Sequence, residues 1–354
     1  MRHIIDPSEI TAAEWDSLYE TARDIMKRPS DYADALRGRV MASLFYEPST
    51  RTNFSFQTAM LRLGGSLFGF SDPVATSVSK GESLKDTVRM CSGYADVLVM
   101  RNPREGAAYA ASLYSSVPLI NCGDGGHLHP TQTLADIATI MHRAGRIDSL
   151  NIGLCGDLKN GRTVHSLIKF LSRSKNVFFY LIAPRNLAIP DYLRAFMMEN
   201  NMKFIEVTGL EATMPLLDVL YMTRIQKERF ADTREYERNK GIYILTASKL
   251  VNAKESLIIM HPLPRVDEIT VDVDSDSRAA YFDTAMHGLY VRMALLLKLC
   301  GAEKQPQDEL NAYGAETVCR NPICITQTEK YLPPLTKETS SGTCCAYCDK
   351  TVTP

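Results

Sequence analysis

The stretch that decides the fold of this chain reads Val40-Met41-Ala42-Ser43-Leu44-Phe45-Tyr46-Glu47-Pro48-Ser49-Thr50-Arg51-Thr52. Its first six residues form an apolar run typical of a buried strand, and the residues after Pro48 open a helix-forming segment. A Ser-Thr-Arg-Thr cluster therefore falls at a helix N-terminus, where backbone N–H groups and the helix dipole favour an anion. The cluster predicts a phosphate site, although the same residues also suit a helix cap beside a surface arginine.

The order of a short apolar run, a turn and an amphipathic helix recurs along the chain. Between several of the apolar runs lie segments whose apolar residues recur at i, i+3, i+4 and i+7, such as the segment from Leu134 to Met141. This alternation predicts an α/β fold with parallel sheets covered by helices on both faces. The candidate strands are Val40–Phe45, Val97–Met100, Pro118–Asn121, Ile152–Cys155, Val177–Ile182, Phe204–Val207, Val219–Met222 and Leu257–Met260.

The length of 354 residues exceeds one ordinary core. We expect two doubly wound parallel-sheet domains joined by long helices, plus a small C-terminal zinc-binding segment. The first domain is expected over residues 1–133, completed by a returning helix over 287–304. The second is expected over 134–286, and a linker with a zinc-ribbon-like tail over 305–354.

The balance of charges argues against nucleic acid and anionic membranes as partners. With 40 basic and 41 acidic residues, the chain has no global charge that would favour nucleic acid or an anionic membrane. No apolar run reaches the ~18 residues of a membrane span, and the acidic first twenty residues are unlike a secretory signal. These features predict a cytoplasmic enzyme without nucleic-acid or membrane partners.

Hydrogen-bond donors follow several of the predicted strands. Ligands of parallel α/β sheets gather at the carboxyl ends of strands, so donors at these positions indicate a site for anions and for a polarised carbonyl. Any one of them, taken alone, also suits a solvated rim or a structural role. The sequence shows no Ser-His-Asp elbow, His-Glu-x-x-His pair or Walker loop. The donors are Arg101, His129, Gln132, Arg162, Arg224, Gln226 and His261.

Two of these motifs, Ser49-Thr50-Arg51-Thr52 and His129-Pro130-Thr131-Gln132, resemble the signatures of the carbamoyltransferases. His261-Pro262-Leu263-Pro264-Arg265 resembles the aspartate carbamoyltransferase catalytic chains, whereas ornithine enzymes carry His-Cys-Leu-Pro. The resemblance extends from about Ser43 to Leu297. It implies transfer of the carbamoyl group of carbamoyl phosphate to the amine of L-aspartate, giving N-carbamoyl-L-aspartate and phosphate in pyrimidine (UMP) biosynthesis. It implies no cofactor for catalysis, with carbamoyl phosphate on the first domain and aspartate on the second.

The resemblance also implies roles for individual residues. Catalytic roles fall to Arg51, Thr52, Lys80, Arg101 and His129. Arg162 is expected to hold the α-carboxylate of aspartate, and Arg224 and Gln226 its β-carboxylate. Carbamoyl phosphate is expected to contact Ser49, Thr50, Arg51, Thr52, Ser77, Lys80, Arg101, His129, Gln132, Leu263 and Pro264.

The polar stretch from Thr76 to Glu82 suits an exposed loop. In the family this loop reaches a neighbouring subunit, so the resemblance implies a homotrimer with shared active sites, completed in trans by Lys80 and a hydroxyl. Thr76 has the expected spacing and Ser77 the expected residue type, and both remain open. Assembly of two trimers through the tail is a further expectation.

Five of the nine cysteines fall in the last 36 residues. The spacings Cys319-x4-Cys324 and Cys345-x2-Cys348 predict a closed structural zinc site, because four thiolates leave no open position. Cys344 is a neighbour of Cys345 that lacks the two-residue spacing. The tail resembles the zinc domain of the aspartate carbamoyltransferase regulatory chain, whose nucleotide-binding domain has no counterpart here. The other four cysteines, expected to be buried, are Cys91, Cys122, Cys155 and Cys300.

The sequence argues against two other functions. One is carbamoyl transfer to another amino acid, against which Pro262, Arg224 and Gln226 argue. The other is a non-catalytic scaffold built around the tail. A scaffold would leave gaps among the donors, and the sequence has none.

Overall fold

The computed structural model describes residues 3–225, 234, 240–301, 319–339 and 342–352. The chain divides into two compact units, one formed by Met1–Leu134 with His287–Pro354 and the other by Ala135–Met286. Each unit contains one parallel sheet, so the α/β prediction of two parallel-sheet domains is confirmed. Within the described residues, no helix has both the length and the apolar character that crossing a membrane requires.

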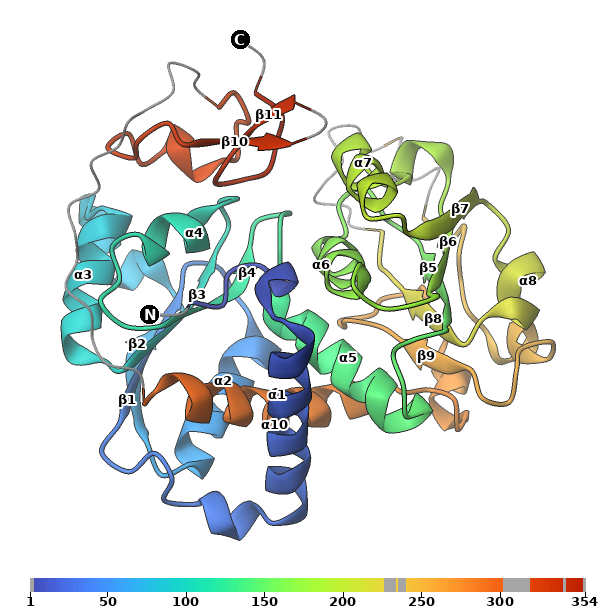
Figure 1. Ribbon diagram of the computed structural model, residues 1–354, viewed down its shortest axis with the longest axis horizontal. Helices are drawn as coiled ribbons and strands as arrows, with labels where there is room; N and C mark the ends of the chain where they lie inside the picture. Colours follow the sequence, from blue (N-terminus) through green and yellow to red (C-terminus); the bar gives the residue numbers. More distant parts are fainter. Residues whose placement is uncertain (1–2, 226–233, 235–239, 302–318, 340–341, 353–354) are drawn as a thin grey trace. The chain divides into compact units, whose positions relative to one another are not determined.

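The first unit is built on a four-stranded sheet in the order β2-β1-β3-β4. Figure 1 shows α3 and α4 on one side of this sheet and α1, α2 and α10 on the other. Its strands are β1 (Val40–Phe45), β2 (Ser66–Phe70), β3 (Val97–Asn102) and β4 (Leu119–Asp124). Its helices are α1 (Ala12–Lys27), α2 (Thr50–Arg62), α3 (Leu84–Tyr94), α4 (Ala107–Ser112) and α10 (Asp283–Leu299), whose first four residues belong to the second unit.

The second unit is built on a five-stranded sheet in the order β7-β6-β5-β8-β9. Helix α5 (Pro130–Ala144) begins in the first unit and ends in the second. The strands are β5 (Asn151–Cys155), β6 (Phe178–Ile182), β7 (Lys203–Val207), β8 (Val219–Met222) and β9 (Ile258–Met260). The other helices are α6 (Arg162–Leu171), α7 (Asp191–Glu199) and α8 (Leu210–Thr213).

Short 3-10 helices occupy several connections. They are η1 (Pro7–Glu9), η2 (Pro29–Tyr32), η3 (Pro73–Ala75), η4 (Ser77–Lys80), η5 (Arg185–Leu187), η6 (Met214–Leu216), η8 (Ala247–Leu250), η9 (Val271–Ser275) and η10 (Ile325–Gln327).

Three strands differ clearly from the sequence prediction; one of them, β4, continues to Asp124, three residues past its predicted end at Asn121. Strand β2 was not predicted, because it is a half-exposed edge strand that has no β-branched residue and is interrupted by Gly69. A Cβ at Gly69 would lie 1.9 Å from the Ser43 carbonyl oxygen, so the close approach of β2 to β1 needs glycine. Strand β3 continues past Met100, and Arg101 lies within it, paired with Phe45 of β1.

The tail folds against the first unit. Its strands β10 (Thr336–Thr339) and β11 (Gly342–Cys345) pair antiparallel, and Figure 1 shows this red hairpin over α4. Buried Cys324 and Tyr347 share one hydrophobic cluster with alanines of α4 such as Ala107. The tail is therefore packed onto the domain that carries the Ser-Thr-Arg-Thr cluster.

Candidate active site

The Ser-Thr-Arg-Thr cluster lies where β1 leads into α2. Ser49 is the residue before the helix, and in the described part of the chain its hydroxyl makes no capping hydrogen bond to the helix. The hydroxyl instead accepts a hydrogen bond of 3.0 Å from Nη1 of Arg101. Because the side chain does not cap the helix, the simple helix-cap interpretation does not account for this serine.

Arg101 is held by two acceptors. Its Nε donates to Oε1 of Glu47 at 2.6 Å, in addition to the bond to Ser49. The Arg101 side chain is 14% exposed, so this pair is partly shielded from water. A guanidinium has five N–H donors. Glu47 and Ser49 therefore fix the orientation of Arg101 while the group retains further donors for a ligand.

A second guanidinium lies near Arg101. Burial and the positive charge of Arg101 together lower the pKa of Arg51. Two cations near each other at a helix N-terminus repel, and an anion between them relieves that repulsion. The electrostatics of the first unit therefore favour a bound anion at the start of α2.

His129 and Gln132 lie where β4 leads into α5. The turn after β4 is closed by Asp124, whose Oδ1 accepts the Leu128 N–H at 3.0 Å. His129 is buried directly before the helix, and Gln132 is partly exposed in the first turn of the helix. Strands β1, β3 and β4 are neighbours and parallel, so the first unit places Ser49–Thr52, Arg101 and His129 at one edge of its sheet.

In the second unit, a close contact joins the ends of β5 and β8. The Thr223 hydroxyl donates to the Cys155 carbonyl at 3.0 Å and accepts the Asp157 N–H at 2.9 Å. Gly156 has φ +118°, and a Cβ there would lie 2.4 Å from the Thr223 carbonyl oxygen. This contact fixes the backbone beside Arg224.

Arg162 and Arg224 both follow strands of the second sheet. Arg162 is the first residue of α6, which follows β5, and Arg224 comes two residues after β8. These two strands are parallel neighbours, so both arginines lie at the carboxyl edge of the sheet. Gln226, also predicted here, falls outside the described residues.

The turn after β9 is shaped by His261. Its Nδ1 accepts the Leu263 N–H at 2.8 Å, and its Nε2 therefore carries the hydrogen donated to Oε1 of Glu268 at 2.7 Å. Leu263 has φ +51° and precedes a cis peptide bond to Pro264. Both His261 and Glu268 are buried. The pair holds in place the backbone of Leu263 and Pro264, whose carbonyls the family resemblance implies as ligands of carbamoyl phosphate.

Lys80 ends the 3-10 turn η4 and is exposed. The Thr76 hydroxyl donates to the Pro73 carbonyl at 2.7 Å and accepts the Val78 N–H at 3.2 Å. Ser77 is exposed beside it. Since Thr76 already stabilises the turn, Ser77 is the more available hydroxyl.

The four tail cysteines predicted to hold zinc lie together. All four sulfurs lie within 4.8 Å of one another, and all four residues are buried. The Sγ atoms of Cys319 and Cys348 are 3.7 Å apart, and those of Cys324 and Cys345 are 4.0 Å apart. A disulfide would require about 2.05 Å, whereas a tetrahedral zinc with bonds of about 2.3 Å places sulfurs about 3.8 Å apart. The cluster therefore fits a metal better than disulfides.

The remaining cysteines match their expected environment. Cys91, Cys122, Cys155 and Cys300 are buried, and burial raises the pKa of each thiol. Such thiols stay protonated and serve as small apolar groups.

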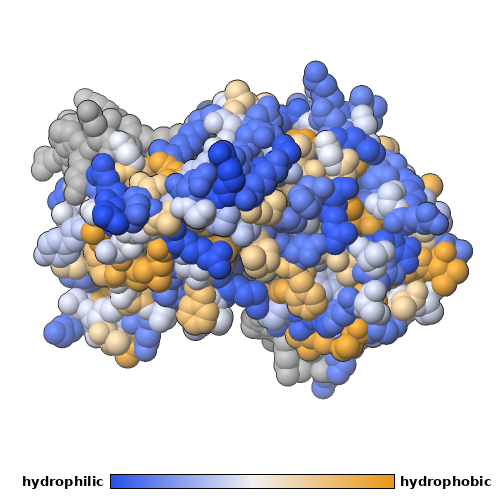
Figure 2. All heavy atoms as spheres, turned by 90° about the horizontal axis from the view of Figure 1, so that it is seen from below, coloured by the Kyte–Doolittle hydropathy of each residue, from blue (hydrophilic) through white to orange (hydrophobic). Residues whose placement is uncertain are grey.

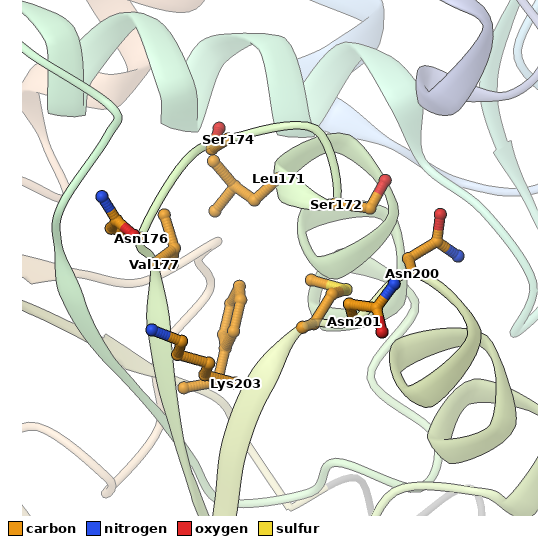
Figure 3. A pocket seen from close by; sticks show the side chains of 10 residues that line it. Leu171, Ser172, Ser174, Asn176, Val177, Asn200, Asn201 and Lys203 are labelled. Carbon is orange, nitrogen blue, oxygen red and sulfur yellow. The ribbon is translucent and has the colours of Figure 1, made fainter.

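A hollow in the second unit lies away from these donors. Figure 3 shows it lined by Ser172, Asn176, Asn201 and Lys203, among others. Its residues lie at the amino ends of β6 and β7 and just before these strands, beside the end of α6. Ligands of parallel sheets bind at the opposite ends, so this hollow is not the predicted active site.

Two family models cover most of the chain. Residues 2–142 match the carbamoyl-P binding domain of aspartate/ornithine carbamoyltransferases, and residues 148–299 match their Asp/Orn binding domain. The chain belongs to the aspartate/ornithine carbamoyltransferase family. Both models end before the cysteine-rich tail, so they say nothing about it.

Named relatives indicate which of the family's two activities this chain has. An aspartate carbamoyltransferase catalytic subunit of Clostridium perfringens is 55% identical over 301 residues, which are 85% of this chain and 98% of the relative. The catalytic subunit of M. jannaschii aspartate transcarbamoylase is 48% identical with TM-score 0.78, covering 84% of this chain and 98% of that one. The Trypanosoma cruzi aspartate transcarbamoylase, solved with carbamoyl aspartate and phosphate, is 39% identical with TM-score 0.79, covering 84% and 96%. The activity of the chain is aspartate carbamoyl transfer.

The His261–Glu268 pair predicts an acid-dependent loss of stability. Burial opposes ionisation of Glu268, but hydrogen bonds from His261 and from backbone N–H groups lower its pKa below the ordinary 4.5. A lowered carboxyl pKa adds stability above pH 4.5, and this contribution disappears as the pH falls from 4.5 through the folded pKa. Glu268→Gln should therefore lower Tm at pH 7, and the difference from the unsubstituted chain should shrink below pH 4.5.

Scanning calorimetry from pH 3.5 to 7 measures this difference. Glu255→Gln, which changes an exposed carboxylate in the same unit, is the matched control and should leave Tm nearly unchanged. A Tm difference for Glu268→Gln that stays constant over this range would contradict the account.

Proposed function

We propose that the donors at the carboxyl edge of the first sheet bind carbamoyl phosphate and that those at the carboxyl edge of the second sheet bind L-aspartate, for the carbamoyl transfer of pyrimidine biosynthesis. The observation that carries this assignment is the fixed Arg101, held by Glu47 and Ser49 beside Arg51 at the start of α2. Fixed donors stabilise developing negative charge without reorganising during the reaction. Such a group suits both a phosphate and a carbonyl oxygen that becomes an oxyanion.

The first unit would hold carbamoyl phosphate. In this proposal the phosphate binds Ser49–Thr52 at the α2 N-terminus, with Ser77 and Lys80 completing the pocket. Thr52, Arg101 and His129 donate to the carbonyl oxygen, where negative charge grows as the amine attacks. Removing one donor of this kind typically costs ~10² to 10³ in turnover.

The second unit would hold aspartate. Arg162 pairs with the α-carboxylate and Arg224, with Gln226, pairs with the β-carboxylate, because planar guanidinium groups match carboxylates. The carbonyls of Leu263 and Pro264 accept from the carbamoyl NH2, together with the Gln132 side chain. The departing phosphate takes the proton from the attacking amine in this proposal.

A homotrimer is the proposed assembly, with Lys80 acting in a neighbouring subunit. Lys80 and Ser77 stand exposed on η4 rather than in the core of their own unit. Large apolar residues are exposed on α2 and α3, and Figure 2 shows hydrophobic areas within a mostly hydrophilic face. Exposed apolar surface of this kind suits a subunit interface. The residues are Phe54, Leu61, Met90 and Tyr94.

Zinc is the proposed structural metal of the tail. Cys319, Cys324, Cys345 and Cys348 would hold it, and the sulfur spacing described above supports this set. Bound zinc would cross-link the two halves of the tail, since so short a segment has little core of its own. Assembly of two trimers through the tail and a cytoplasmic location stay predictions.

The substrate assignment is tested by initial rates with aspartate and with ornithine. We expect carbamoyl aspartate from the first and no turnover above background with the second.

Arg224→Ala removes the guanidinium proposed for the β-carboxylate, so the KM for aspartate should rise ~10- to 100-fold. The KM for carbamoyl phosphate should stay within about two-fold. Arg234→Ala is the control, an arginine later in the same region of the chain. An unchanged aspartate KM in Arg224→Ala would contradict the assignment.

The shared site is tested by mixing inactive chains. Lys80→Ala and Arg51→Ala should each be nearly inactive alone. A mixed trimer contains some sites that receive both native side chains, so dissociation and reassembly of the mixture should restore a fraction of the activity. The control mixes Arg51→Ala with Arg101→Ala, two changes within the same subunit's half of the site, which should restore none. No recovery in the first mixture would contradict a site completed in trans.

A further inference from the structure

The tail contacts the turn that follows β3. The Glu105 N–H donates to the Ile323 carbonyl at 3.0 Å, and the Ile325 N–H donates to the Glu105 carbonyl at 2.9 Å. Nδ2 of Asn321 donates to Oε2 of Glu105 at 2.8 Å. Glu105 is buried. These bonds tie the tail to the backbone four residues after Arg101.

A buried ion cluster joins the tail to the turn that follows β4. Nδ1 of His127 lies 3.0 Å from Oδ2 of Asp124, and its Nε2 lies 3.1 Å from Oδ2 of Asp349 in the tail. The His127 side chain is 7% exposed and that of Asp349 is 13% exposed. Burial would lower the pKa of His127, but the two carboxylates override it and raise the pKa to about 10. His127 therefore lies between two carboxylates, one of them in the tail, two residues before His129.

The two turns are also joined to each other beneath the tail. The Gly106 N–H donates to Oδ2 of Asp124 at 2.8 Å, so the same carboxylate oxygen serves Gly106 and His127. Gly106 has φ +80°, and a Cβ there would lie 2.6 Å from the backbone of Tyr347. The tail backbone therefore touches the turn so closely that no side chain fits between them.

The tail also caps α3, the helix that follows the Lys80 turn. The Leu84 N–H donates to the Glu329 carboxylate at 3.3 Å, and the Lys85 N–H donates to the Tyr331 hydroxyl at 2.8 Å. A carboxylate at a helix N-terminus satisfies N–H groups and complements the helix dipole. The tail thus contacts segments next to three of the proposed donors, Lys80, Arg101 and His129.

We propose that Asp349, acting through His127, is a positioning residue for the carbamoyl phosphate site, and that the folded tail fixes the turns from which Arg101 and His129 project. This inference rests on the proposed function of those two side chains. Asp349 directly follows Cys348, so the cysteine cluster determines where its carboxylate lies. The tail thereby acts within its own chain on the site for one substrate.

This role predicts a specific kinetic signature. Loss of the Asp349 carboxylate leaves His127 with one partner in a buried position and loosens the turn before His129. Misplaced donors weaken the bound phosphate and the developing oxyanion, and a small displacement can cost up to ~10² in rate. We expect kcat/KM for carbamoyl phosphate to fall ~10- to 100-fold. The aspartate KM at saturating carbamoyl phosphate should change less than two-fold, because Arg162 and Arg224 belong to the other unit.

The test uses Asp349→Asn in the full chain, with Glu338→Gln as the matched control. Glu338 is another tail carboxylate, exposed and bonded to Thr343 within the tail hairpin. The control should keep both KM values and kcat. A purely structural role for Asp349 would reduce the fraction of active enzyme, lowering kcat and leaving both KM values unchanged. That result would overturn the proposal.

A second variant guards against a tail that fails to fold. His127→Gln changes the other side of the contact, far in sequence from the cysteines. The zinc content of both variants is measured. If Asp349→Asn has lost its zinc, the proposal is judged on His127→Gln, provided that this variant keeps the zinc content of the unsubstituted chain. Hydrogen exchange of residues 103–107 and 124–128 should speed up in His127→Gln and not in Glu338→Gln. Unchanged exchange and an unchanged carbamoyl phosphate KM in His127→Gln would overturn the proposal.

A different result would contradict the proposed function itself. If Arg101→Ala leaves the carbamoyl phosphate KM unchanged, the assignment of the site is wrong. If Arg101→Ala raises it while His127→Gln and Asp349→Asn do not, only the inference about the tail is wrong.

Discussion

The parallel pairing of β1 with β3 and of β3 with β4 is the constraint on which the rest of the first unit depends. Parallel strands end at the same edge, so donors that are far apart in the sequence converge there without any contact between their own segments. Arg101 pairs with Phe45 through the sheet, and this register brings its guanidinium to Glu47 and Ser49. A shift of one residue would turn Arg101 to the other face.

In the second unit, too, the proposed donors follow parallel strands, but other contacts hold them in place. Its donors follow β5 and β8, and the contact between Gly156 and Thr223 fixes the backbone beside them. In the turn after β9, His261 holds the backbone through one hydrogen bond and Glu268 holds His261. The groups expected to touch substrate are thus supported by buried partners, whose loss should weaken binding without removing a substrate contact.

Local pattern was enough to predict most of the fold. Eight strands of the two sheets and the long helix α5 follow from apolar runs and helical spacing, because buried parallel strands are continuous apolar runs. Strand β2 was not predicted, because its pairing depends on a close approach of Gly69 to Ser43 of β1, which no local sequence pattern reveals. The substrate-facing donors were found from their position after strands and from the family resemblance. The support of His261 by Glu268 is set by a tertiary contact for which the sequence offers no rule.

The cysteine spacings predicted which four sulfurs would meet, but not where the tail would dock. The docking depends on Glu105, Gly106 and His127, which look like ordinary turn residues in the sequence. Their partners lie more than two hundred residues away, so only the folded chain shows the connection between the tail and the turns beside Arg101 and His129.

The most direct measurement of the central claim is calorimetric titration of the full chain with carbamoyl phosphate in the absence of aspartate. Arg51→Ala should weaken binding ~10- to 100-fold, because it removes one charge-assisted contact with the phosphate. Arg62→Ala, which changes an exposed arginine in the last turn of the same helix, should bind like the unsubstituted chain. Equal affinity in Arg51→Ala and Arg62→Ala would contradict the account.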